Sequence, residues 1–118
     1  MTEKRNAAEH IPLTAPEFHV LATLAEGPKH GYLIMKDVAE RTEGQVELST
    51  GTLYGIVKRL ARNGWIAETR HENNVGGRRR RSYRLTGFGR EVAKAEAERL
   101  RRVVLLARDY RLLGPETA

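Results

Sequence analysis

The sequence predicts a mainly α-helical fold with a small β-hairpin and a long C-terminal helix. Three observations support this prediction. Apolar residues recur at helical spacing in three short segments between residues 14 and 63. Alternating residues then surround a Gly- and Asn-rich turn at 73–77, and helical spacing returns over residues 86–113. The length of 118 residues fits one domain of ordinary size.

The first two helices are bounded by start and stop signals. Thr14 and Glu17 have the spacing of a capping box, so a helix is expected to begin there and to end before Gly27. A second helix is predicted over residues 31–42. Its apolar stripe is expected to comprise Leu33, Ile34 and Val38, with Met35 as a further candidate.

A third helix is predicted from the N-cap residue Ser49 to Asn63, with Gly64 beyond its end. Just before it, the alternation of Val46 and Leu48 with polar neighbours favours a very short strand. One face of the third helix is predicted to be core, formed by Leu53, Ile56, Val57 and Leu60.

The hairpin is expected to consist of strands over residues 65–72 and 78–85, with Tyr83 and Leu85 facing the core. The final helix, capped by Thr86 and reaching Leu113, would be about 40 Å long. That exceeds what so small a core needs, so we expect a second copy of the chain to cover its broad apolar face. The predicted dimer interface comprises Ala93, Ala97, Leu100, Val103, Val104, Ala107 and Tyr110.

The positive charge is concentrated in one third of the chain. Residues 49–86 hold nine Lys or Arg against two Glu, a net charge of +7, whereas the rest of the chain has a net charge of −1. A concentrated basic segment is typical of proteins that bind a polyanion, although a solvated surface is the alternative explanation.

The sequence gives little support for a catalytic site, a metal site or a membrane-spanning segment. The four histidines lack metal-ligand spacing, cysteine is absent, and no phosphate-binding or dinucleotide-binding motif is complete. We therefore expect no enzyme activity, catalytic residue, metal or cofactor. No signal peptide or apolar membrane span is evident, which favours a cytoplasmic protein.

The predicted order of helices and hairpin is that of a winged helix-turn-helix, in which the third helix enters the major groove. The domain boundaries expected are a flexible arm at 1–12, a DNA-binding domain at 13–85, a dimerisation helix at 86–113 and a tail at 114–118. Gly55 on the exposed face suggests close approach of the backbone to a partner. The predicted DNA contacts are Ser49, Thr50, Thr52, Tyr54, Lys58, Arg59, Arg62, Arg78, Arg79, Arg80 and Arg81.

Three segments resemble the PadR family of bacterial transcriptional regulators, in its compact branch with a single C-terminal helix. They are the His-Gly-Tyr start at residues 30–32, the Ser-Thr-Gly-Thr-Leu-Tyr segment at 49–54, and the Gly-Arg to Tyr-Arg-Leu-Thr segment at 77–86. The resemblance implies a homodimer that represses transcription from a nearly palindromic operator. It also implies relief by a small-molecule effector in some members, but this chain offers no evident site for one.

Two alternatives remain from the sequence. An RNA- or ribosome-associated protein would use the same basic segment, but RNA binders usually stack exposed aromatic residues on bases, and aromatic residues are only 6% of this chain. The second alternative is an interaction module or a small enzyme, in which the basic hairpin would have no part in the function.

Overall fold

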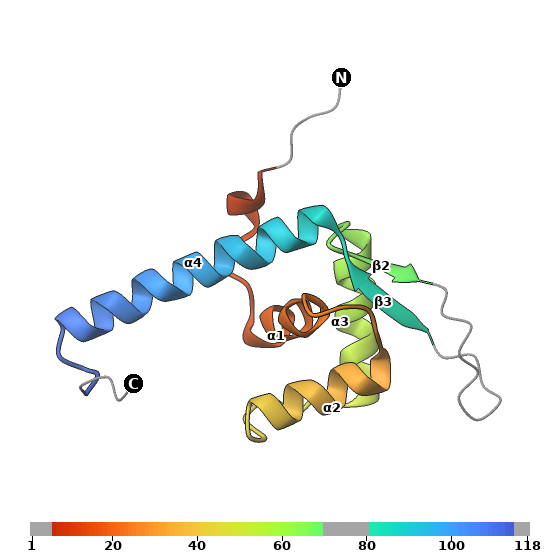
Figure 1. The fold of residues 1–118 in the computed structure, drawn as a ribbon, viewed down its shortest axis with the longest axis horizontal. Helices are drawn as coiled ribbons and strands as arrows, with labels where there is room; N and C mark the ends of the chain where they lie inside the picture. The colour runs from red at the N-terminus through yellow and green to blue at the C-terminus, as the bar shows by residue number, and fades with distance from the viewer. Residues whose placement is uncertain (1–5, 70–80, 115–118) are drawn as a thin grey trace.

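The computed structural model describes residues 6–69 and 81–114. Its helices and strands in chain order are η1 (Ala7–His10), α1 (Ala15–Leu24), β1 (Lys29–His30), α2 (Gly31–Arg41), α3 (Thr50–Arg62), β2 (Ile66–Thr69), β3 (Ser82–Leu85) and α4 (Gly87–Asp109). The strands form one antiparallel sheet in the order β1-β3-β2. Figure 1 shows α1, α2 and α3 packed together, with α4 extending away from them. The predicted fold class is confirmed.

The predicted caps are present. In α1 the Thr14 hydroxyl accepts the backbone N–H of Glu17 at 3.2 Å, while the Glu17 carboxylate accepts the backbone N–H of Thr14 at 2.9 Å. In α3 the Ser49 hydroxyl accepts the N–H of Thr52 at 3.1 Å. Gly64 ends α3 at a φ of 80°, a conformation that costs glycine little.

The core lies between the first three helices and the sheet. The predicted face of α3 is buried, as are Ile34 and Val38 of α2. Leu33 is 45% exposed, so its assignment to the apolar stripe of α2 was wrong. It lies beside Ile34 in sequence, about 100° around the helix, and only one of the two points into the core.

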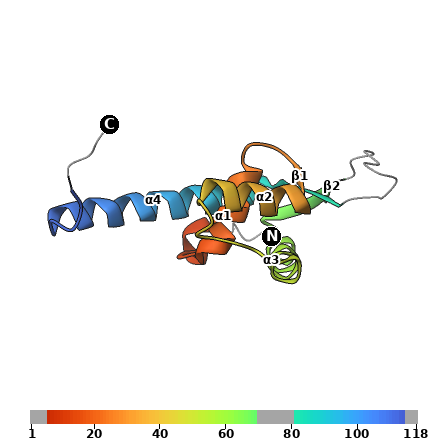
Figure 2. The same cartoon turned by 90° about the horizontal axis from the view of Figure 1, so that it is seen from below.

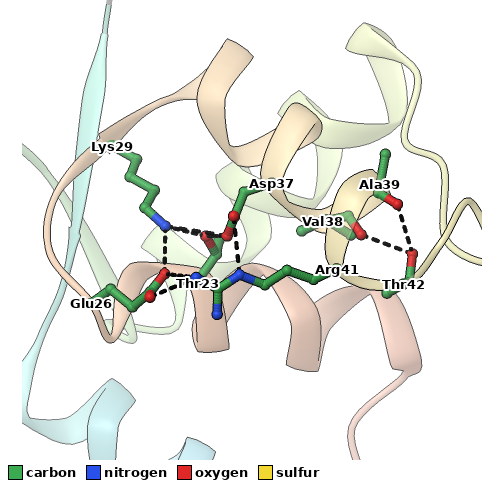
Figure 3. Close-up of polar contacts among 8 residues, drawn as sticks. All are labelled: Thr23, Glu26, Lys29, Asp37, Val38, Ala39, Arg41 and Thr42. Atoms are coloured by element: carbon green, nitrogen blue, oxygen red, sulfur yellow. Dashed lines mark hydrogen bonds and ion pairs between the residues drawn. The ribbon is translucent and has the colours of Figure 1, made fainter.

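A polar network joins α1 to α2 (Figure 3). The buried Thr23 hydroxyl donates to Asp37, and Lys29 bonds to Thr23 at 2.5 Å and to Asp37 at 3.2 Å. Arg41 pairs with Asp37 at 3.0 Å and with Glu26 at 2.6 Å. Opposite charges therefore neutralise one another along this edge of the fold.

The sheet differs from the prediction in one strand. Residues 46–48 form no strand, because the Thr42 hydroxyl bonds the backbone N–H of Val46 and no other strand lies beside it among the described residues. The third strand is instead β1, which pairs with β3 through Lys29↔Tyr83 and His30↔Ser82. Tyr83 is buried and Leu85 is half-buried, in agreement with the prediction.

The final helix is shorter than expected. It ends at Asp109, because Arg111 adopts a left-handed φ of 61° and the N–H of Leu112 bonds the Ala107 carbonyl at 2.9 Å. This is the closing geometry of many helix ends, here without the glycine that would have signalled it.

The predicted flexible arm also differs from the structure over residues 6–12. Residues 7–10 form η1, and the ring of His10 meets Trp65 and Phe88 edge-on at centroid distances of 5.5 and 5.6 Å. The polar composition of this segment predicted a flexible arm, because composition does not reveal ring contacts with residues that are distant in the sequence.

Candidate nucleic-acid interface

The outer face of α3 is open to solvent. Thr50, Gly51, Thr52, Gly55 and Lys58 are exposed, as is Arg62 near the end of the helix. A Cβ built at Gly51 or Gly55 meets no atom within 4 Å. No described residue therefore packs on this face, and the backbone is accessible in two successive turns.

The cations on α3 differ in their partners. Arg59 pairs with Glu17 of α1, with 3.2 Å between Nε and Oε2, and only 13% of the Glu17 side chain is exposed. Lys58 and Arg62 form no ion pair with any residue in the described ranges. They retain their full charge for an external anion, whereas part of the Arg59 charge is neutralised within the fold.

Tyr54 lies where α3 meets the start of α2. A Cβ at Gly31 would come within 3.1 Å of the Tyr54 hydroxyl oxygen, so a larger residue at 31 would displace the ring. Tyr54 remains 42% exposed. The hydroxyl end of Tyr54 thus lies against Gly31, and the exposed part of the residue belongs to the outer surface of α3.

The hairpin is joined to the helices by a buried polar contact. Ser82 of β3 is 1% exposed, and its Oγ lies 2.7 Å from Nδ1 of His30. His30 also precedes the first residue of α2. The contact gives His30 a structural role, since it links β3 to β1 directly before α2 begins.

Of the four predicted contacts at residues 78–81, only Arg81 falls within the described residues. Arg81 is exposed and lies 3.6 Å from Glu68 of β2, and it also hydrogen-bonds Tyr83. Burial raises the pKa of the Tyr83 hydroxyl, so this residue stays protonated at neutral pH.

Figures 1 and 2 place α3 and the β2–β3 pair at the end of the molecule away from the C-terminal end of α4. The structure thus gathers the described predicted contacts, Ser49 to Arg62 and Arg81, at one end. Sequence reasoning missed the acidic partners Glu17 and Glu68. Glu17 is 42 residues from Arg59, and no local spacing links them.

Within the part of the chain that the structure describes, no group of three or more His, Cys, Asp or Glu could hold a metal ion. In the same residues, no helix has the length and apolar character needed to cross a membrane.

Comparison with known proteins gives a consistent result. A family model described as the transcriptional regulator PadR-like family matches residues 20–95. A PadR family transcription regulator from Clostridium difficile R20291 is 26% identical, with a TM-score of 0.72, over 82% of this chain and 98% of that chain. A transcriptional regulator from Clostridium thermocellum is 28% identical, with a TM-score of 0.67, over 80% of this chain and 90% of that chain. An uncharacterised protein of Lysinibacillus sphaericus is 28% identical over 83 residues, which are 67% of this chain and 75% of that protein.

Proposed function

This chain belongs to the PadR-like family of transcriptional regulators, and from that premise we propose that it binds double-stranded DNA in the cytoplasm as a homodimer and represses transcription. The family consists of regulators and not of enzymes, in agreement with the absence of a catalytic motif in the sequence.

The observation that carries the proposal is the outer face of α3. It combines two glycines with open space around them and two cations, Lys58 and Arg62, that have no acidic partner within the described ranges. A helix of this kind suits the major groove, since the glycines permit close approach and the cations reach phosphates or base edges. The hairpin would add contacts to the DNA phosphates through Arg78, Arg79, Arg80 and Arg81.

The dimer would form through the C-terminal half of α4. Val103, Val104, Leu106 and Tyr110 are between 47% and 73% exposed. Soluble monomers rarely display so continuous an apolar surface, and a second α4 would cover it. Two copies would read two half-sites, which implies a nearly palindromic operator.

The proposal is tested by the salt dependence of binding to duplex DNA. Each lost phosphate contact reduces the slope of log K against log salt by about 0.9. The variant Lys58→Ala/Arg62→Ala is therefore expected to bind more weakly, with a slope shallower by almost two units. The matched control is Lys94→Ala/Arg102→Ala, which removes two exposed cations from α4 and should keep the wild-type slope.

An unchanged slope in the α3 variant would remove this helix from the interface. Tighter binding of duplex RNA than of duplex DNA by the wild type would favour the RNA-associated alternative.

A further inference from the structure

Helix α4 divides into two parts at Glu96. Its buried residues are Gly89, Val92 and Glu96, and no residue from 97 to 109 is buried in the described chain. The first part belongs to the same core as α1 and η1, whereas the second part extends away from it (Figure 1). Glu96 is thus the last residue of α4 that is fully buried in the domain.

The side chain of Glu96 is only 2% exposed, and its carboxylate accepts three hydrogen bonds. Its Oε1 accepts Nε of Arg99 at 2.6 Å and its Oε2 accepts a terminal nitrogen of Arg99 at 2.9 Å. The carboxylate also accepts a backbone hydrogen bond from Leu13. Leu13 immediately precedes the capping residue of α1 and is itself buried in the core.

The contacts of Glu96 are directional, in contrast to the apolar packing around them. A two-pronged arginine–carboxylate pair fixes angle as well as distance. The bonds to Arg99 lie within α4 and orient the carboxylate, whereas the bond from Leu13 joins α4 to the segment that precedes α1. A buried carboxylate is costly when it loses a partner, so a shift of α4 away from Leu13 is penalised. An apolar residue at 96 would tolerate such a shift more easily.

The same side of α4 continues beyond Glu96 as an exposed apolar surface. At about 100° per residue, Val103 and Tyr110 fall on the side that Val92 and Glu96 occupy. Val103 is 47% exposed and Tyr110 is 73% exposed. A single face is therefore covered by the domain up to Glu96 and available to a second copy after it.

From this arrangement we propose that Glu96 is a positioning residue that sets the direction of α4 relative to the DNA-binding domain and, through the dimer, the separation between the two α3 helices. The inference rests on the proposed function. Glu96 touches neither the outer face of α3 nor the apolar residues Val103 and Tyr110, so its effect would appear in the half-site spacing that the dimer prefers.

The experiment uses duplexes that the wild-type protein enriches from a random-sequence library. The half-site spacing of the best duplex is then changed by one, two or five base pairs, and the affinity of each duplex is measured. Five base pairs are about half a helical turn, so a rigid dimer cannot engage both half-sites there.

Glu96→Gln preserves the size of the side chain, but loses the ion pair with Arg99 that orients the side chain toward Leu13 and replaces the carboxylate that accepts the Leu13 N–H by a weaker, neutral acceptor. It is expected to bind an isolated half-site within about twofold of wild type, while its preference for the native spacing over a two-base-pair change falls at least about threefold. Glu98→Gln is the control, because Glu98 pairs on the exposed surface with Arg101 and Arg102 and should keep the wild-type profile.

Arg99→Lys provides the same comparison if Glu96→Gln fails to fold, since lysine retains the charge without the two-pronged geometry. A folded, dimeric Glu96→Gln or Arg99→Lys variant with the wild-type spacing profile would overturn this inference alone. If the wild type enriches no duplex, the proposed DNA binding fails instead.

Discussion

Gly89 shows how one residue joins the DNA-binding domain to the last helix. A Cβ at this position would lie 1.9 Å from the carbonyl oxygen of Trp65, so only glycine fits. Next to it, the Thr86 hydroxyl accepts the N–H of Gly89 and donates to the Gly64 carbonyl. The start of α4 is therefore fastened to the turn that follows α3.

Gly89→Ala is expected to reduce the free energy of unfolding by more than about 3 kcal/mol, because backbone must move to admit the methyl group. Urea denaturation measures this loss. Gly87→Ala is the matched control: its Cβ would meet nothing within 4 Å, and it should leave stability unchanged or slightly increased. Equal stabilities of the two variants would contradict the close contact with Trp65.

The carboxyl group of Asp37 makes stability depend on acid pH. The hydrogen bond from Thr23 lowers its pKa most, and Lys29 and Arg41 lower it further, against the opposing effect of burial. Because the folded pKa lies below the unfolded value of about 3.9, the stabilisation is present above that value and is lost as pH falls through the folded pKa.

Asp37→Asn should therefore reduce the melting temperature at pH 7 and make it less dependent on pH below about 4. Thermal unfolding followed across this range by circular dichroism tests the expectation. Glu91→Gln, on the exposed surface of α4, provides a comparison that should retain the wild-type acid dependence. The same acid dependence in Asp37→Asn and wild type would be evidence against the network.

At the scale of a helix, α3 carries two opposed requirements. Its inner face is a compact apolar stripe that stabilises the fold. Its outer face includes Gly55, which costs a helix interior about 1 kcal/mol relative to alanine. No neighbour among residues 6–69 and 81–114 requires that glycine, since its Cβ would meet nothing within 4 Å.

Gly55→Ala is thus expected to raise the free energy of unfolding by about 0.5 to 1 kcal/mol and at the same time to weaken DNA binding. The two changes have opposite signs because the methyl group is free of the protein but would lie between α3 and the duplex. Chemical denaturation and DNA titration measure them separately. Undiminished affinity in the stabilised variant would show that Gly55 does not approach DNA.

At the scale of the whole molecule, the C-terminal part of α4 has no packing partner among the described residues of one chain. Its last part is covered by no other element of the described chain, and its exposed apolar face continues the face that the domain buries near Val92. Helices shorter than about 12 to 15 residues are marginal without tertiary packing, so a partner would stabilise this part of α4.

The variant Val103→Asp/Val104→Asp should be monomeric in analytical ultracentrifugation at concentrations where the wild type is a dimer. Both side chains are 47% exposed, so the folded domain should survive the change. Lys94→Asp places a carboxylate on the exposed surface of α4, about 180° around the helix from Val103, and should stay dimeric. A stable dimer with aspartate at both 103 and 104 would exclude this surface as the interface.

The elements that the sequence predicted correctly are those specified by neighbouring residues. Capping residues Thr14, Ser49 and Thr86, and the apolar face of α3, depend on spacings of three or four residues. Such signals act through local hydrogen bonds and helical periodicity, which can be recognised without knowing what packs against the helix.

The remaining features depend on residues that are far apart in the chain. Strand β1 exists because β3 lies beside Lys29 and His30, and the Arg59–Glu17 pair forms because α1 and α3 meet. Thus the sequence by itself determined the order of the four α-helices and the hairpin, the basic segment and the exposed face of α3. Only the tertiary structure decided which cations remain unpaired within the described chain and where α4 leaves the core, because charge neutralisation and burial depend on distances in space.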